Sequence, residues 1–171
     1  DWATYVGLAV TASRLDVRPF SPGVAVASDT AATLVLNSNP TIISRGDIKV
    51  VNSGEQIDPG FPIYLNSSGE AMLASSSTAE TSLVVGISVS SAFGSGRPLA
   101  YVEECTLDFT AESGEVVAGR YIALSGTAGV LQDADDIATG DFVTIVGVGI
   151  SDSQIRFRPH SSGVAAAADV V

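Results

Sequence analysis

Apolar residues in this chain occur in short runs or alternate with polar ones, and no window keeps helical spacing beyond two turns. The run at residues 5–11 (YVGLAVT) is followed after three residues by 15–20, where apolar and charged side chains alternate. Two strands joined so closely predict a hairpin. Helix is expected at most as single turns, within 133–140 and 164–170. Similar patterns predict further strands at residues 33–37, 41–44, 48–51, 83–90, 99–109, 142–150 and 155–158.

These strand patterns repeat along the chain. Residues 6–25 and 146–165 are identical at nine of twenty aligned positions, and several of the differences exchange one apolar side chain for another, such as Leu for Val, Val for Ile and Leu for Ile. A related core, VVGISVSS, occupies residues 84–91. Recurrence of one pattern indicates a scaffold made from copies of a small unit.

A second pair of matching segments spans residues 54–73 and 114–132. Each reads Gly-Glu, a glycine turn, an Ile-x-Leu strand, a small polar turn that ends in Gly, and a short apolar strand. A strand containing Val-Gly follows each segment, so we interpret the two as copies of a strand-turn-strand module. The aligned positions are Ile63 with Ile122, Leu65 with Leu124 and Gly69 with Gly129.

The repeats predict an all-β fold with little helix, in which compact β-barrel, β-tulip-like or sandwich units are built from duplicated strand-turn-strand modules. We expect an N-terminal hairpin with connecting strands at residues 1–52 and a first β unit at 53–110. A second β unit with an apolar C-terminal tail is expected at 111–171. One intertwined domain that includes the N-terminal hairpin is the alternative to separate units.

Charge narrows the possible partners. The chain has 19 Asp and Glu against 8 Lys and Arg, which gives a formal net charge of −11. Binding to nucleic acid needs clustered Lys and Arg, so no nucleic-acid partner is expected. No membrane partner is expected either, because anionic surfaces repel such a chain and no apolar run approaches the ~20 residues of a membrane helix. Charged residues make up only 16% of the sequence, which suits a surface that is buried in an assembly.

The residues that carry chemistry in enzymes are scarce or misplaced here. The single histidine, His160, aligns with Phe20 of the first repeat, which favours a packing or surface position over a catalytic base. Asp29-Thr30-Ala31 lacks the glycine of an aspartic protease motif. We therefore predict no catalytic residues and expect that the chain is not an enzyme; an enzyme with an Asp/Glu pair has no support in the spacing.

Metal and cofactor sites are not expected either. One cysteine, Cys105, and one histidine are too few for a zinc site, and no glycine-rich phosphate loop with lysine is present. The acidic segment 133–136 offers oxygen ligands for a hard cation, but a solvated acidic loop is the favoured interpretation. Arg45-Gly46-Asp47 matches the integrin-recognition tripeptide and is interpreted as a turn. Glu103 and Glu104 should point to opposite faces of a strand, with at least one meeting solvent or an arginine from a partner.

Most of the first β unit, and less strictly the second, follows a recognisable pattern. A Pro-Ile-x-Leu strand, a polar turn, a short strand, a Val-Gly-Ile strand and a closing strand follow one another between residues 62 and 102, and less strictly between 121 and 158. This pattern resembles the core of bacteriophage capsid decoration (cement) proteins of the lambda type. The residues that carry the resemblance are Pro62-Ile63-Tyr64-Leu65, Gly69, Met72-Leu73, Val85-Gly86-Ile87 and Leu99-Ala100-Tyr101-Val102.

The resemblance implies a structural protein of the virion without enzymatic activity. Such a protein binds the outer surface of the phage head, stabilises contacts between major capsid protein subunits, and associates with itself as a homotrimer or a dimer. Both ends of the chain are apolar and are the expected contact arms, residues 1–18 and 163–171. The candidate partner-binding residues in these arms are Trp2, Tyr5, Val164, Val170 and Val171.

A different class of function stays open at this point. The chain is alternatively a carbohydrate- or receptor-binding β module of a phage fibre or spike. Sugar sites use exposed aromatic side chains as stacking platforms, and only 6% of the residues here are aromatic. Trp2 and Tyr64 are the candidate platforms.

Overall fold

The computed structural model describes residues 8–11, 14–16, 35–36, 40–109 and 116–167. The chain divides into two units, residues 1–32 and 33–171. In the first unit, β1 (Leu8–Thr11) and β2 (Arg14–Asp16) pair as an antiparallel hairpin, as the sequence pattern predicts. The predicted continuation of the second strand, residues 17–20, lies outside the described residues.

The second unit is built almost entirely of antiparallel strands, so the all-β prediction is confirmed. One helical element occurs among its described residues, the short 3₁₀ turn η2 (Ala134–Asp136). The seven-stranded sheet runs, in order, β3 (Val35–Leu36), β14 (Leu131–Asp133), β13 (Tyr121–Leu124), β15 (Phe142–Gly149), β16 (Gln154–Ala165), β12 (Cys105–Asp108) and β4 (Thr41–Arg45).

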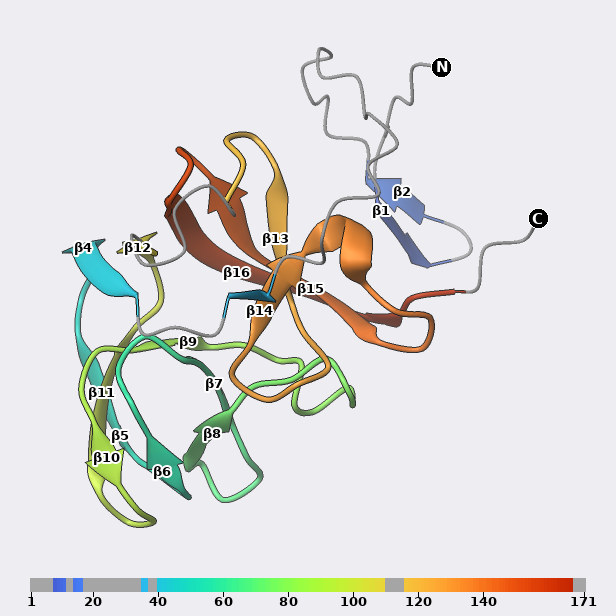
Figure 1. Ribbon diagram of the computed structural model, residues 1–171. Helices are drawn as coiled ribbons and strands as arrows, with labels where there is room; N and C mark the ends of the chain where they lie inside the picture. The colour runs from blue at the N-terminus through green and yellow to red at the C-terminus, as the bar shows by residue number, and fades with distance from the viewer. Residues whose placement is uncertain (1–7, 12–13, 17–34, 37–39, 110–115, 168–171) are drawn as a thin grey trace. The chain divides into compact units, whose positions relative to one another are not determined.

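A five-stranded sheet and a small ribbon complete this unit (Figure 1). None of the sheets closes into a barrel within the described part of the chain. The strand β12, which belongs to the segment 53–110, lies in the seven-stranded sheet beside strands from 111–171. The five-stranded sheet runs β5 (Lys49–Asn52), β11 (Pro98–Val102), β9 (Gly86–Ser88), β7 (Pro62–Leu65) and β8 (Ala71–Leu73), and the ribbon pairs β10 (Ala92–Phe93) with β6 (Gln56–Ile57).

The two sheets contain the duplicated module in the same register. In β7 and β8, Ile63 pairs with Leu73, and at the aligned positions of β13 and β14, Ile122 pairs with Asp133. The next strand also matches, because Ile63 pairs with Gly86 of β9 and Ile122 pairs with Gly147 of β15. The order β8-β7-β9-β11 therefore corresponds to β14-β13-β15-β16.

The hairpin of the first unit repeats part of this module. Leu8 pairs with Asp16 in β1–β2, and the aligned residues Val148 and Arg156 pair in β15–β16. The neighbouring pair also corresponds, because Ala9–Leu15 aligns with Gly149–Ile155. Sequence identity between the two ends of the chain thus reflects one hairpin register used twice.

Glycine recurs in the module because the backbone requires it. Gly69 and Gly129 end the turns between the paired strands with φ of 76° and 77°, a left-handed conformation that glycine adopts without strain. Gly86 and Gly147 have a different role. A Cβ on Gly147 would lie 2.3 Å from the carbonyl oxygen of Arg156, and one on Gly86 would lie 2.4 Å from that of Val102. These two glycines let neighbouring strands approach closely.

The apolar side chains form two cores. The larger core includes buried residues of both sheets, such as Tyr64 and Ile87 of the five-stranded sheet and Ile122 and Phe157 of the seven-stranded sheet. The smaller core lies on the other side of β7 and includes Ile63. Because β7 and β9, inside the five-stranded sheet, are buried on both faces, they read as continuous apolar runs in the sequence, without the alternation of a half-exposed strand.

A bent ribbon of two long segments joins the sheets. Residues 41–52 pair antiparallel with residues 98–108, first as β4 with β12 and then as β5 with β11. The Gly46 N–H donates to the Glu104 carbonyl oxygen at 2.9 Å, midway between the two ladders. Arg45-Gly46-Asp47 therefore lies in a bend of a continuous edge and does not reverse the chain as a turn would, because the strands on either side pair with successive segments of one neighbour.

Candidate functional site

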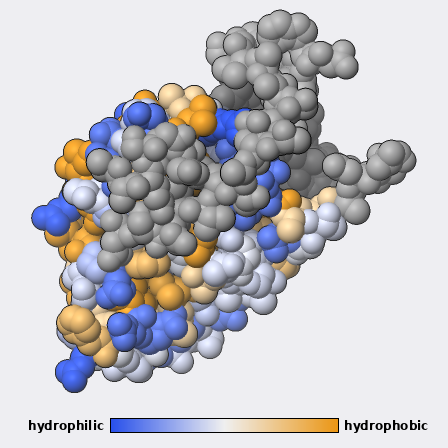
Figure 2. Space-filling model, viewed as in Figure 1, coloured by the Kyte–Doolittle hydropathy of each residue, from blue (hydrophilic) through white to orange (hydrophobic). Residues whose placement is uncertain are grey.

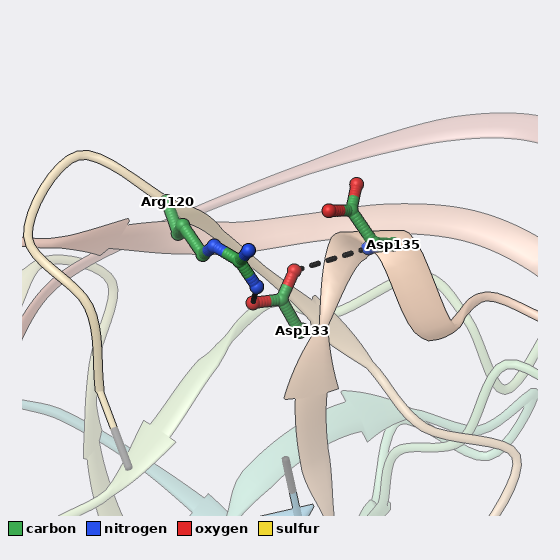
Figure 3. A network of polar contacts seen from close by, with 3 residues as sticks. All are labelled: Arg120, Asp133 and Asp135. Carbon is green, nitrogen blue, oxygen red and sulfur yellow. Dashed lines mark hydrogen bonds and ion pairs between the residues drawn. The ribbon is translucent and has the colours of Figure 1, made fainter. Parts of the chain in front are cut away.

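An ion pair between Arg120 and Asp133 is the most enclosed group of charges in the described residues (Figure 3). An Arg120 guanidinium nitrogen lies 2.9 Å from an Asp133 carboxylate oxygen, whose side chain is 9% exposed. The other Asp133 oxygen accepts a hydrogen bond from the Asp135 N–H at 3.1 Å and caps η2. Both carboxylate oxygens are thus used in holding the module together.

This arrangement corrects the interpretation of 133–136 as a solvated acidic loop. Asp135 is exposed, as expected of such a loop, but Asp133 is buried in β14. Asp133 is the last residue of β14 and pairs with Ile122 of β13, which places its carboxylate against the Arg120 side chain. Within the described residues, no group of three or more His, Cys, Asp or Glu side chains is placed to hold a metal ion.

Glu103 and Glu104 both meet solvent and both pair with a cation. Glu103 is bonded to Lys49 across the bent ribbon. A Glu104 oxygen lies 2.9 Å from Nε of Arg158, which belongs to β16. The sequence predicted that at least one of them meets solvent or an arginine from a partner; both are exposed, and the arginine that pairs with Glu104 comes from this same chain. Each of these exposed pairs contributes little stability because water and salt screen the charges.

A shallow groove of about 310 Å³ lies beside these charges. Half of its lining residues are apolar, and the charged ones are already engaged, Glu104 with Arg158 and Glu103 with Lys49. The groove offers neither a buried nucleophile nor an unpaired acid, so it has the character of a surface hollow between the sheets. Its lining residues are Val84, Val85, Glu103, Glu104, Arg158 and Pro159.

A serine- and threonine-rich loop docks onto the second copy of the module. The Ser82 carbonyl oxygen accepts hydrogen bonds from the Thr144 and Ser161 hydroxyls, each at 2.8 Å. The backbone of Ser76 also binds this loop to the second copy. The Ser76 N–H donates to the Ser125 carbonyl oxygen, and the Ser76 carbonyl oxygen accepts from the Phe142 N–H. Side-chain hydroxyls that bond backbone carbonyls position a loop, so this network is structural.

The reactive side chains singled out by the sequence lie apart from one another. Cys105 is 6% exposed in the larger core, and burial raises the pKa of its thiol to about 12, which keeps it protonated and unreactive at neutral pH. His160 is exposed on β16, in register with Ile145 of β15. Tyr64, a candidate sugar platform, is only 9% exposed and packs in the larger core. The prediction of Tyr64 as a stacking surface is therefore wrong.

Of the five candidate partner-binding residues, the structure describes Val164. Its side chain is 47% exposed near the end of β16. The following Ala166 N–H donates to the Asp141 carbonyl oxygen at 2.7 Å, which ties the end of this strand to the start of β15. Trp2, Tyr5, Val170 and Val171 lie outside the described residues.

Other apolar side chains are exposed on elements that the sequence did not single out. Phe93, at the end of β10, is 81% exposed. Ile43, Ile48 and Val50 are 52%, 48% and 69% exposed along β4, β5 and the bend between them. Figure 2 shows apolar and polar residues side by side at the left margin of the body, where Figure 1 places β4. A single exposed apolar residue is ordinary, but a row of them on a strand edge indicates a contact surface.

The described residues contain no helix that is long and apolar enough to cross a membrane. Comparison of the sequence with protein-family models and with curated proteins finds no match. The resemblance to decoration proteins therefore depends on the strand and glycine pattern of the chain itself. The geometry adds exposed apolar strand edges and a buried, already paired set of charges.

Proposed function

We propose that this protein is a capsid decoration protein, which binds the outer surface of a phage head and stabilises contacts between major capsid protein subunits. The observation that carries the proposal is the distribution of side chains. In the described residues, the repeated polar and glycine positions serve packing, while apolar residues such as Val164 and Phe93 face solvent at strand ends. This arrangement favours binding through surfaces over chemistry in a pocket.

The β16 end is the proposed capsid contact in the described part of the chain. Its exposed Val164 lies next to the segment that contains Val170 and Val171, so an apolar contact would extend across both. Many copies on one lattice turn a modest affinity per copy into a stable clamp through multivalency. The acidic net charge of −11 implies that the capsid face it meets is neutral or basic.

A head-binding assay tests this proposal. Isolated phage heads stripped of the protein are incubated with the purified chain, and retained protein is measured after sedimentation at rising temperature. Val164→Asp should reduce occupancy, because a charge replaces an apolar contact. Val117→Asp is the matched control, since Val117 is also 47% exposed but lies in a different segment.

A truncation after Ala167 tests the tail separately. It removes 168–171 and leaves the Ala166–Asp141 backbone bond in place, so the sheet is preserved. Lower retention of both variants supports the proposed contact. Equal retention of wild type, Val164→Asp and the truncation rejects the contact arm, and a wild-type chain that does not bind heads rejects the function. Glycan binding that is lost on substitution of Trp2 would favour the receptor-binding alternative instead.

A further inference from the structure

Three side-chain oxygen atoms from other segments of the chain lie close to Gly126, in the turn between β13 and β14. A Cβ on Gly126 would have the two Asp141 carboxylate oxygens at 3.6 and 3.7 Å and the Ser76 hydroxyl oxygen at 3.8 Å as its nearest neighbours outside the turn. Glycine places only a hydrogen atom there. One position beside the backbone is therefore shared by a carboxylate and a hydroxyl.

Neither of these two polar groups has a partner within the described part of the chain. Ser76 is 0% exposed, and its hydroxyl makes no hydrogen bond there. The partly buried Asp141 carboxylate likewise makes no hydrogen bond or ion pair with the described residues. A buried hydroxyl without a partner is costly and rare in native proteins, so it indicates that a water or an ion binds beside it.

Hydrogen bonds hold the segments that carry these oxygens in place. The Ser76 N–H donates to the Ser125 carbonyl oxygen at 2.9 Å, and the Phe142 N–H donates to the Ser76 carbonyl oxygen at 2.8 Å. The Ser77 hydroxyl donates to the Gly126 carbonyl oxygen at 3.1 Å. The loop, the turn and the start of β15 are thus joined before a ligand binds, which lowers the entropic cost of binding.

The chemistry of these oxygens suits calcium. Ca²⁺ takes about six to eight oxygen ligands, accepts a carboxylate through both of its oxygens, and completes its shell with water. The nearly equal distances of 3.6 and 3.7 Å mean that Asp141 presents both oxygens to the Gly126 position. Mg²⁺ fits less well, because it demands near-ideal octahedral geometry. The net charge of −11 also favours a cation as the ligand.

We propose that this position binds one calcium ion, with the Asp141 carboxylate and the Ser76 hydroxyl as protein ligands and water as the others. The ion would link the loop at residues 75–82, which follows the first copy of the module, to the second copy. A single carboxylate implies weak binding, with a dissociation constant of ~10⁻⁴–10⁻³ M. The site is distinct from the acidic segment 133–136, is independent of capsid binding and goes beyond the proposed function.

Calcium-dependent stability tests the site. The purified chain is stripped with a chelator and dialysed, and its unfolding temperature is measured as calcium chloride is raised at constant ionic strength. The range extends to ~20 mM, well above the expected dissociation constant. The unfolding temperature of wild type should rise with calcium, because a ligand that binds only the folded chain stabilises it. Magnesium at the same concentrations should raise it less.

Three variants remove the site in different ways. Asp141→Asn keeps the shape of the carboxylate but not its charge, and should weaken calcium binding at least ~10-fold. Ser76→Ala removes the unpartnered hydroxyl, so it should weaken calcium binding without destabilising the calcium-free chain. Gly126→Ala places a methyl group among the three oxygens, at 3.6 Å or more from each, and should block the ion without a clash. Asp152→Asn, exposed in the turn of β15–β16, is the matched control and should respond as wild type does.

Amide chemical shifts locate the ion. In a calcium titration of the isotopically labelled chain, the shifts should change at residues 75–77, 125–127 and 141–142 and follow one binding curve. The proposal is overturned if wild type does not respond, if Asp141→Asn and Gly126→Ala respond as wild type does, or if the changes spread over the exposed acidic residues. A cooperative calcium-free transition verifies that each variant is folded. None of these results bears on retention by phage heads.

Discussion

At the scale of single residues, Gly86 and Gly147 allow neighbouring strands of the module to approach each other closely. Each lies where a side chain would collide with the backbone of the adjacent strand, at 2.4 Å and 2.3 Å from a carbonyl oxygen. The sequence shows that Val-Gly recurs, but not why, because the reason lies in a strand that is distant in sequence. Only the pairing of β9 with β11 and of β15 with β16 brings that carbonyl into place.

Substitution of Gly147 by alanine should destabilise the fold. A backbone carbonyl cannot move aside as a flexible side chain can, so we expect Gly147→Ala to lower the free energy of unfolding by about 1–3 kcal/mol. Gly126→Ala is the control, since its Cβ would lie 3.6 Å or more from its neighbours. Urea denaturation measures both. Equal midpoints for the two variants would contradict the close-approach role.

The buried thiol of Cys105 predicts a pH dependence. Burial raises its pKa from 9.0 to about 12, so the folded chain retains this proton where the unfolded chain releases it. The thiol's contribution to the free energy of unfolding is fully present below pH 9 and is lost as the pH rises towards 12. Wild type should lose stability between pH 9 and 11 more steeply than Cys105→Ala, as measured by denaturant midpoints. Parallel pH profiles would show that the thiol is not responsible.

At the scale of elements, the strands were predictable and their neighbours were not. The hydrophobic pattern placed strands at β7, β9, β13 and β15, and the repeats predicted their equivalence. The pattern did not reveal that residues 41–44 and 48–51 belong to different sheets, because a bend at Gly46 leaves no local signal. The exposed edge was missed for the same reason, since exposure depends on which strand lies alongside.

The serine- and threonine-rich loop is an element whose docking can be tested. Thr144 is 1% exposed and its hydroxyl bonds the Ser82 carbonyl at 2.8 Å. Thr144→Val keeps the shape and removes this donor, which should cost about 1 kcal/mol while Ser161 still satisfies the carbonyl. Adding Ser161→Ala leaves that carbonyl without either hydroxyl and should cost more than the sum of the single changes.

Amide hydrogen exchange measures the local protection of backbone amides in the same variants. Protection of residues 75–82 should fall in Thr144→Val and fall further in the double variant, while protection of β7 stays unchanged. Ser44→Ala is a suitable comparison, because it removes a hydroxyl bond to Thr106 on the exposed side of β4. A uniform loss of protection throughout the sheets would mean that the loop is not held by these bonds.

At the scale of the whole molecule, the shared core couples the two sheets. Cys105 lies in the larger core, to which both sheets contribute, and the bent ribbon passes from one sheet to the other. We expect the unit 33–171, expressed alone, to unfold in one cooperative transition. Far-UV circular dichroism and thiol labelling of Cys105 should change at the same denaturant concentration. Labelling well before the loss of strand signal would show that the sheets separate first.

The candidate site was accessible to sequence reasoning only in part. The apolar end of the chain drew attention to Val164, which is exposed. The burial of Asp133 and its pairing with Arg120 were not foreseen, because an acidic segment looks the same whether its first residue ends a buried strand or lies in solvent. Tyr64 was misjudged because the β7 strand is covered on both faces.

The position of β16 has a consequence for how the protein is made. This strand lies inside the seven-stranded sheet, between β15 and β12, although it follows every other described strand in the chain. A ribosome therefore synthesises β3, β4 and β12 well before the strand that unites them. An incomplete chain that lacks β16 leaves the hydrogen-bonding edges of β15 and β12 unpaired. Such edges make the chain prone to aggregation or proteolysis. Only copies that contain β16 would then be available for the proposed binding to capsids.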